Sequence, residues 1–355
     1  MLKGIDNGIL DEPPVRYQTI HASQGDQWRF AADWPVPTQQ LTSYYFGAGR
    51  SGTVASINDG TLSSKKPKHK SGRDHYRVDY DIAAFDGKFN RLGRTWEGDM
   101  TAGVDLKGLT YTTAPLADDQ EMTGHPVAHL WVTSSAPDGN FIVYIEDVDP
   151  SGTSRFVTDG AMRAAHRKVE AKSPWKEIGV PYHRSFEADY APLSATRAVE
   201  LAFDFNPISY VFQKGNRIRI TVTGAEKMTY QMPPGADASA PPRINLYWTI
   251  EYASYVAFPL IPARSSRYQG TAEINTGTLK YHGPAEFYPS GKISYLRLGE
   301  QWIKCATGLA ARAGLKASYV CDSRIGSLRV ERKGSGGSSQ ARLVGSGVAF
   351  SGSGF

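Results

Sequence analysis

Short segments in which hydrophobic and polar residues alternate recur along most of the chain. The clearest is residues 216–222, where three aliphatic side chains share one face and Arg217 and Arg219 share the other. A period of two residues is that of a β-strand with one buried face. The alternation predicts that the arginines face outward and that the aliphatic side chains face a core. These side chains are Ile218, Ile220 and Val222.

Similar β-branched and aromatic segments predict further strands at residues 15–20, 41–46, 127–132, 141–145, 154–158, 198–203 and 255–261. Helical periodicity is scarce, and its best candidate is residues 303–315. Many short strands separated by turns predict an all-β fold, a β-sandwich of the jelly-roll type.

A change of pattern after the last of these strands predicts a domain boundary. We expect a jelly roll over residues 1–267 and a smaller β-rich extension over residues 268–345. Glycine and serine dominate from Lys333 onward, so residues 346–355 are expected to form a flexible tail.

Composition narrows the classes of function. The 355 residues include 36 Gly, 21 Pro and 19 Tyr, which suits short strands and turns. Much of the net charge of +5 comes from the basic run at residues 65–70, which lacks interleaved aromatics and is interpreted as a solvated loop. We therefore expect no nucleic-acid partner. The sequence has neither a long apolar run nor an apolar leader at the N-terminus, so we expect no membrane partner either. The compartment is left open.

Residues 147–152, DVDPSG, begin like a calcium loop of the EF-hand type. The twelfth position of such a loop requires a glutamate, and here it holds Thr158. The flanking segments are strand-like instead of helical. The Asp-Pro-Ser-Gly sequence therefore predicts a hairpin turn and no metal site.

Other motifs typical of cofactor binding or catalysis are incomplete or lie in segments of the wrong secondary structure. Gly47 to Gly52 match G-x-G-x-x-G, but turn-forming residues follow where a dinucleotide site needs a helix. His125 and His129 are four residues apart, which on a strand is too far for one zinc ion. No serine stands in a G-x-S-x-G nucleophile elbow. No catalytic residue, metal ligand or cofactor is therefore assigned.

The two cysteines are Cys305 and Cys321. A disulfide between them would close a loop of about 15 residues and stabilise the fold by roughly 3 kcal/mol. Two buried free thiols are equally compatible with their strand-like surroundings, so the pairing stays open.

Several segments together, in order and spacing over residues 1–262, resemble the C-terminal part of the CocE/NonD hydrolases, relatives of the X-Pro dipeptidyl-peptidases. They include EPPVR at 12–16, WR at 28–29, DWP at 33–35, LTYTTAPL at 109–116, TGHP at 123–126, EDVDPSG at 146–152, GAMRA at 160–164, SYVF at 209–212, GNRIR at 215–219 and PLIP at 259–262. One departure is Asn216, where the family often has histidine. The resemblance does not extend to residues 268–355.

The resemblance implies a galactose-binding-like jelly roll that packs against an α/β-hydrolase catalytic domain. That domain carries the Ser-Asp-His triad and cleaves esters, amides or Xaa-Pro peptides. Its triad would lie upstream of Met1 or on a separate chain, so whether this chain is itself an enzyme stays undecided. The expected partner is that catalytic domain, and self-association of the isolated chain is left open.

One segment is a candidate for a binding role. Phe89 and Trp96 lie in an expected long loop over residues 85–99, which would wall a neighbouring active site. Burial of Trp96 in the sandwich is the simpler interpretation. The alternative function is a free-standing β-sandwich module that binds carbohydrate or another polymer.

Overall fold

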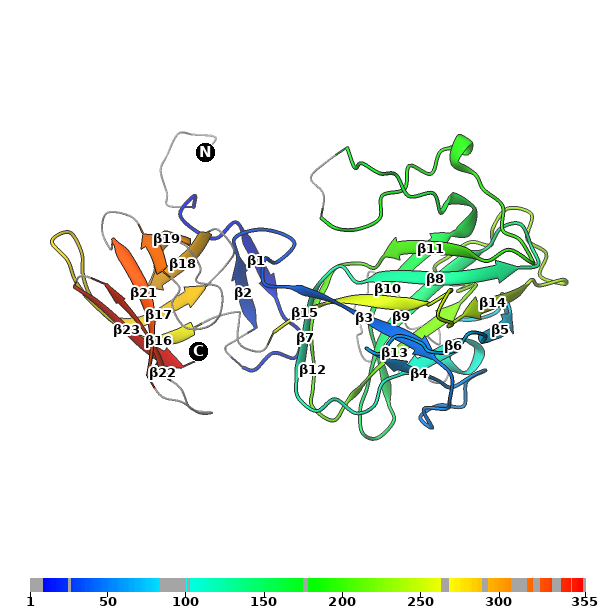
Figure 1. Cartoon of the computed structure of the whole chain (residues 1–355), viewed down its shortest axis with the longest axis horizontal. Coiled ribbons are helices and arrows are strands. Elements are labelled where there is room, and N and C mark those ends of the chain that lie inside the picture. Colours follow the sequence, from blue (N-terminus) through cyan, green and yellow to red (C-terminus); the bar gives the residue numbers. More distant parts are fainter. Residues whose placement is uncertain are drawn as a thin grey trace. The chain divides into compact units, whose positions relative to one another are not determined.

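The computed structural model describes residues 9–24, 27–83, 100, 103–174, 178–262, 268–288, 293–307, 318–321, 326–333, 340–345 and 347–353. The chain divides into two compact units (Figure 1). The sandwich unit is Gln40–Leu260, and the barrel unit joins Met1–Gln39 to Ile261–Phe355. Within the described ranges, helical structure is limited to the 3-10 turns η1 (Asp105–Lys107), η2 (Ala164–His166) and η3 (Glu187–Asp189).

The expected all-β class is therefore confirmed. None of the described helical segments is long and apolar enough to cross a membrane.

The sandwich unit is built from one continuous sheet of thirteen strands. They are β3 (Gln40–Gly47), β4 (Gly60–Ser63), β5 (Arg73–Arg77), β6 (Leu109–Thr112), β7 (Gln120–Gly124), β8 (Val127–Ser134), β9 (Asn140–Val148), β10 (Ser154–Arg163), β11 (Val199–Asp204), β12 (Ile208–Phe212), β13 (Arg217–Thr223), β14 (Arg243–Tyr247) and β15 (Tyr255–Ile261). The strands expected from the sequence in this range are all present.

The strand order shows that the fold depends on pairings between distant segments. It runs β10-β9-β13-β6-β4-β3-β15-β8-β14-β5, while β11 pairs with β8, and β7 pairs with β12 and β15. β4 and β6 run parallel, and the neighbouring pairs β13–β6 and β3–β4 run antiparallel. The continuous sheet folds over on itself, which encloses a core between its faces and confirms the β-sandwich.

Aromatic and aliphatic side chains fill this core. The rings of Phe46 on β3 and Tyr111 on β6 stack with centroids 4.1 Å apart. All but the first residue of β9 are buried, so both faces of this central strand are covered. Burial on this scale is the main source of the stability of such a sandwich.

The expected outward orientation of Arg219 is wrong. Ile218, Ile220 and Val222 are buried as predicted, but Arg219 is fully buried too. The second face of β13 is covered by η1 and by the loop before β4, which supply Asp105 and Thr53 as partners. Alternation therefore identified the strand but not the number of its buried faces.

The barrel unit contains a hairpin and a closed barrel. β1 (Val15–Gln18) pairs antiparallel with β2 (Trp28–Ala31). Eight further strands close on themselves in sequence order. They are β16 (Tyr268–Asn275), β17 (Lys280–Tyr288), β18 (Ile293–Leu298), β19 (Gln301–Thr307), β20 (Ser318–Cys321), β21 (Ser327–Lys333), β22 (Gln340–Gly345) and β23 (Val348–Ser353). β16 pairs with both β17 and β23, which closes the ring.

Three features of this unit differ from the sequence interpretation. Residues 348–353, expected in a loose tail, form β23, because β16 and β22 pair with them on either side. Residues 303–307, expected to start a helix, belong to β19, where Ile303 and Cys305 are buried and Lys304 is exposed. Residues 1–39 group with the barrel unit instead of the sandwich unit.

Packing explains why the N-terminal residues group with the barrel. Ala31 and Val36 form a buried cluster with Ile261, and Phe30 packs against Tyr288 and Trp302. A disulfide joins Cys305 on β19 to Cys321 on β20, at directly paired positions of the two strands.

Candidate functional site

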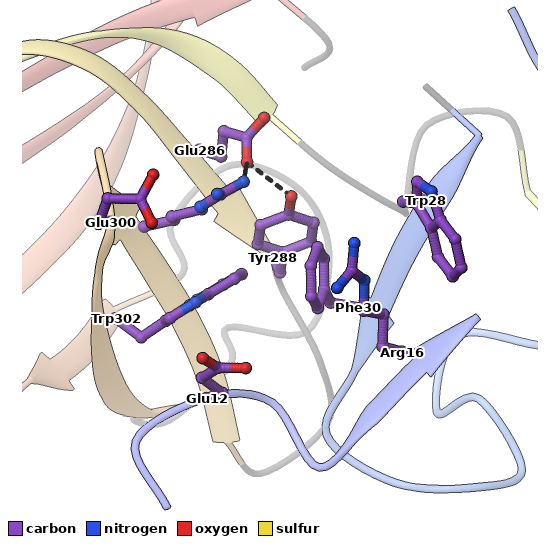
Figure 2. Close-up of a pocket in the computed structure, with 9 residues that line it drawn as sticks. Glu12, Arg16, Trp28, Phe30, Glu286, Tyr288, Glu300 and Trp302 are labelled. Carbon is purple, nitrogen blue, oxygen red and sulfur yellow. Dashed lines mark hydrogen bonds and ion pairs between the residues drawn. The ribbon is translucent and has the colours of Figure 1, made fainter. Parts of the chain in front are cut away.

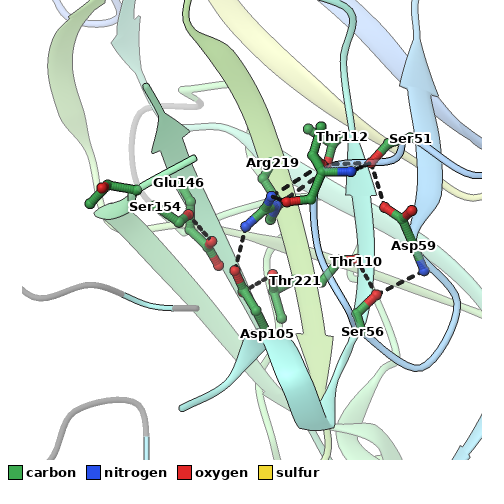
Figure 3. A network of polar contacts seen from close by, with 12 residues as sticks. Ser51, Ser56, Asp59, Asp105, Thr110, Thr112, Glu146, Ser154, Arg219 and Thr221 are labelled. Atoms are coloured by element: carbon green, nitrogen blue, oxygen red, sulfur yellow. Dashed lines mark hydrogen bonds and ion pairs between the residues drawn. The ribbon is translucent and has the colours of Figure 1, made fainter. Parts of the chain in front are cut away.

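A buried polar network lies where β13, β6, η1 and the loop before β4 meet (Figure 3). Arg219 Nη1 is 2.5 Å from Asp105 Oδ2, and the other carboxylate oxygen accepts a hydrogen bond from Thr221 Oγ1 at 2.8 Å. The same guanidinium donates to Thr112 Oγ1 at 3.1 Å and to Thr53 Oγ1 at 3.2 Å. A guanidinium withdrawn from water needs such partners, because an unpaired buried charge is very costly.

The glycine-rich sequence at residues 47–52 belongs to the loop that reaches this network. Gly49 and Gly52 have φ of 99° and 72°, the left-handed region that favours glycine. Ser51 Oγ donates to Asp59 Oδ1 at 2.5 Å, and Gly52 N donates to Asp59 Oδ2 at 2.8 Å. β4 follows this loop, so the expectation of a loop without a dinucleotide-binding helix is confirmed.

Glu146 on β9 is a second carboxyl beside the network. It is fully buried and accepts a hydrogen bond from Ser154 Oγ at 2.6 Å. Burial raises the pKa of this carboxyl well above its usual range, and the nearby charge of Asp105 raises it further, against an opposing effect of Arg219. One buried cation among two carboxyls favours a proton on one of them, and the direction of the shift assigns it to Glu146.

The sequence at residues 147–152 forms the expected turn between β9 and β10. Asp149 Oδ1 accepts hydrogen bonds from Ser151 N at 2.9 Å and Thr153 N at 3.2 Å, and Gly152 has φ of 92°. Asp147 points elsewhere, toward Tyr210 Oη at 2.8 Å and Asn216 Nδ2 at 2.9 Å. The two carboxylates are thus used separately as hydrogen-bond acceptors.

Asp149 also pairs with Arg155, whose Nη1 lies 2.9 Å from Oδ2. The Ser151 hydroxyl, followed by Arg155 and the backbone N–H groups of the turn, holds the pKa of the Asp149 carboxyl below its usual range.

The two histidines near β8 have separate carboxylate partners. His129 Nδ1 is 2.9 Å from Glu200 Oε1, and its ring stacks on Tyr255 with centroids 4.4 Å apart. His125 Nδ1 is 3.5 Å from Asp204 Oδ2. Both interactions join neighbouring segments of the sheet, which is a structural use of histidine.

Other candidates from the sequence are also placed. Asp81 Oδ1, shortly after β5, lies 3.8 Å from Lys227 Nζ. The basic run at residues 65–70 is largely exposed in the loop between β4 and β5, as expected. Phe89 and Trp96, with the rest of residues 84–99, lie outside the described residues, so their predicted binding role stays a prediction.

A small surface pocket of about 180 Å³ lies in the sandwich unit, and one of its lining residues, Tyr80, shortly precedes that segment in the sequence. Tyr80 and the residues around Tyr230 line it, and Tyr230 Oη donates to Asp159 Oδ2 at 2.8 Å. Met228 and Met232 on this surface are 59% and 43% exposed. No sequence motif marked this surface, because its residues come from separate loops.

Comparison with known families gives one match over most of the chain. The model of the X-Pro dipeptidyl-peptidase C-terminal non-catalytic domain matches residues 7–246. This agrees with the resemblance found in the sequence segments. The match ends before the barrel strands.

Curated relatives carry esterase names. A protein of Mycobacterium bovis named as a serine esterase is 36% identical over 271 residues, which cover 73% of this chain and 39% of the relative. The cocaine esterase of a Rhodococcus species is 29% identical over 233 residues, which cover 64% of this chain and 37% of the relative. The chain therefore spans about two fifths of the length of these relatives.

A solved structure supports the fold. The crystal structure of a CocE/NonD family hydrolase from Staphylococcus aureus matches with a TM-score of 0.51 and 18% identity, over 74% of this chain and 43% of that chain. At this level of identity the likeness concerns the fold alone.

Proposed function

We propose, from the premise that this chain belongs to the X-Pro dipeptidyl-peptidase C-terminal non-catalytic domain family, that it is the non-catalytic part of a CocE/NonD-type serine hydrolase. The observation that carries this proposal is the extent of the match. The family model covers residues 7–246, and the esterase relatives extend over more than twice the matched length. Their catalytic machinery would then belong to the part that this chain does not match.

In this proposal the partner is an α/β-hydrolase catalytic segment, on the same polypeptide or on a separate chain. That segment would supply the nucleophilic serine, the histidine base and the orienting carboxylate, which act together in acyl transfer. The substrate class is an ester, an amide or an Xaa-Pro peptide. The sandwich unit would contribute a rigid wall for the substrate and no reacting group.

The described serines and carboxyls are consistent with a structural role for the network around Arg219. Ser51 and Ser154 donate directly to Asp59 and Glu146. Ser154 and Glu146 are both fully buried, so a substrate does not reach this pair. The network would fix the loop before β4 and η1 to the sheet, and so hold the surface that faces the catalytic segment.

The methionine-bearing surface beside Tyr80 is the proposed docking face for the catalytic segment. Exposed methionines adapt to the shape of a partner at little cost. Met232 lines the same pocket as Tyr80, which in the sequence shortly precedes the segment 85–99 that is predicted to wall the active site. The length by which the relatives exceed this chain indicates what would cover this face.

A chimera tests the proposal. The segment of the Mycobacterium bovis relative that precedes the matched part is fused to residues 1–355, and hydrolysis of p-nitrophenyl butyrate is compared with the full relative and with the unfused segment. We expect the fusion to restore hydrolysis that the unfused segment loses. A folded but inactive chimera, beside an active full relative, would contradict the proposal.

Matched variants locate the docking face. Met228→Glu with Met232→Glu should lower the activity of the chimera at least tenfold, because two charges would be buried at the contact. Ile250→Glu is the control. Ile250 is as exposed as Met228. It follows Tyr247, the last residue of β14, which pairs with Arg73 at the start of β5. Tyr80 follows the other end of β5, so Ile250 lies away from the proposed docking face.

A further inference from the structure

The barrel unit contains a larger pocket, of about 360 Å³, between the β1–β2 hairpin and the strands β17, β18 and β19 (Figure 2). Its walls thus combine a segment inside the family match with strands beyond residue 246. The volume falls at the lower end of the range for small-molecule sites. Nothing in the proposed hydrolase role requires this pocket.

One wall of the pocket is a packed cluster of aromatic rings. The Phe30 ring is 4.9 Å from the Trp302 ring and 5.5 Å from the Tyr288 ring, and Tyr288 and Trp302 are 5.4 Å apart. Tyr288 and Trp302 are only 2% and 8% exposed. Their orientations are therefore fixed by packing before any ligand arrives, which lowers the entropic cost of binding.

Two guanidinium groups lie against these rings. The Arg16 guanidinium is 4.5 Å from the Trp28 ring and 5.6 Å from the Phe30 ring, and Figure 2 shows it between them. The Arg297 guanidinium is 5.4 Å from the Trp302 ring. Stacking on aromatic faces holds both planar groups in place.

Glu286 fixes one side of the pocket. Its Oε2 accepts a hydrogen bond from Tyr288 Oη at 2.8 Å and pairs with Arg297 Nη1 at 3.3 Å. Arg297 Nε is enclosed and has no hydrogen-bond partner among the described residues. A buried donor without a partner is costly, but because the protein encloses this atom a ligand would contact the other nitrogens of the guanidinium.

Two further carboxylates at the pocket have no hydrogen-bond or ion-pair partner among the described residues. Glu12 and Glu300 line the pocket, and the described part of the chain gives neither of them an ion pair or a hydrogen bond. Arg16 likewise has aromatic contacts there but no carboxylate partner. The pocket thus offers strong acceptors and strong donors side by side.

We propose that this pocket binds a neutral carbohydrate. A cationic ligand would meet the guanidiniums of Arg16 and Arg297, and an anionic ligand would meet three carboxylates, so the nearly balanced charges disfavour both. A sugar hydroxyl donates and accepts at once, and therefore uses a carboxylate and a guanidinium together. The Trp28 ring, which lines the pocket and is 48% exposed, provides an apolar surface against which the C–H groups of a sugar pack.

The proposal is tested by saturation-transfer NMR on the full chain. The probes are D-glucose, D-galactose, D-mannose, D-xylose and their common disaccharides, with tetramethylammonium, acetate and glycylglycine as charged comparators. The variant Glu12→Gln with Glu300→Gln removes two charged acceptors at exposed positions and leaves the packed rings unchanged. Glu273→Gln on β16 is the matched control, an exposed glutamate of the same barrel that does not line the pocket.

We expect at least one sugar to bind, an affinity loss of tenfold or more in the double variant, and no change in Glu273→Gln. Absence of transfer to every sugar would overturn the proposal, as would equal transfer to the wild type and the double variant. Binding of tetramethylammonium or acetate in place of the sugars would overturn the argument from charge balance, and binding of the zwitterion glycylglycine in their place would overturn the assignment of a carbohydrate. None of these outcomes depends on hydrolase activity, so the two proposals fail separately.

Discussion

Arg219 and Asp105 form an ion pair in which neither side chain is exposed to solvent, with Nη1 and Oδ2 2.5 Å apart. The pair joins β13 to η1 across the face of the sheet that alternation had predicted to be outward. Threonine hydroxyls complete the hydrogen bonding of both groups. The guanidinium therefore links both η1 and the loop before β4 to β13.

Replacement of Arg219 by methionine should destabilise the sandwich unit by about 3–5 kcal/mol, because it leaves the Asp105 carboxylate buried without its cation. The matched control is Lys107→Met. Lys107 pairs with Asp79 at 2.8 Å, but the two side chains are 47% and 37% exposed, so the expected loss is below about 1 kcal/mol. Urea unfolding of the whole chain measures the loss of stability in each variant, and hydrogen exchange of β13 peptides in the folded protein shows whether the loss falls on the sandwich unit. Equal losses would contradict the account.

Glu146 predicts a specific pH dependence. Its pKa is raised in the folded state by burial and then by Asp105. Its contribution to stability is therefore fully present below the unfolded pKa of about 4.3 and is lost as pH rises through the raised folded pKa. Glu146→Gln imitates the protonated form, so its stability relative to the wild type should increase as pH rises from 4 toward neutral.

Melting temperatures at several pH values measure this difference. Glu187→Gln, an exposed glutamate of the same unit, is the control and should follow the wild type at every pH. A difference between Glu146→Gln and the wild type that does not vary with pH would contradict the assignment of the proton to Glu146.

Local sequence patterns predicted the strands well but not their partners. β-branched alternation located β13, β15 and the β9–β10 hairpin, because these signals lie within a few residues. The burial of Arg219 could not be predicted, since its compensating carboxylate, Asp105, comes from a segment far away in the sequence. The same holds for the pocket in the barrel unit, where Phe30 and Trp302 are in contact but come from segments far apart in the sequence. Residues 303–307 have a weak helical pattern but form a strand, because β18 and β20 pair with them on either side.

The turn after β9 depends on backbone conformation at Gly152. Its φ of 92° disfavours any residue with a Cβ, although nothing stands within 4 Å of the added atom. Gly152→Ala should therefore cost about 1–2 kcal/mol. Gly139→Ala, at the other end of β9, meets only an ordinary contact 4.0 Å from Phe141 and should change stability by less than about 0.5 kcal/mol.

Because Asp149 is held by the turn itself, EDTA should leave the melting temperature of the wild type unchanged. A fall in the melting temperature with EDTA, reversed by calcium, would contradict the interpretation of the turn as free of metal.

Reduction of the disulfide should act on the barrel unit alone. Cys305 and Cys321 are 16 positions apart, and opening a loop of this size should cost roughly 3 kcal/mol. Hydrogen exchange of β19 peptides with and without a phosphine reductant measures this loss. Peptides of β13 in the sandwich unit are the internal control. Equal exchange of the β19 peptides in both conditions would show that the disulfide does not stabilise the barrel.

The central claim is that this chain contributes no nucleophile. The most direct measurement treats the purified chain with a fluorophosphonate probe and records its intact mass together with hydrolysis of p-nitrophenyl butyrate. We predict an unchanged mass and a rate equal to that of the heat-unfolded chain. A stoichiometric adduct on a serine of residues 1–355, with parallel loss of a measurable hydrolysis rate, would contradict the account and make this chain a catalytic unit.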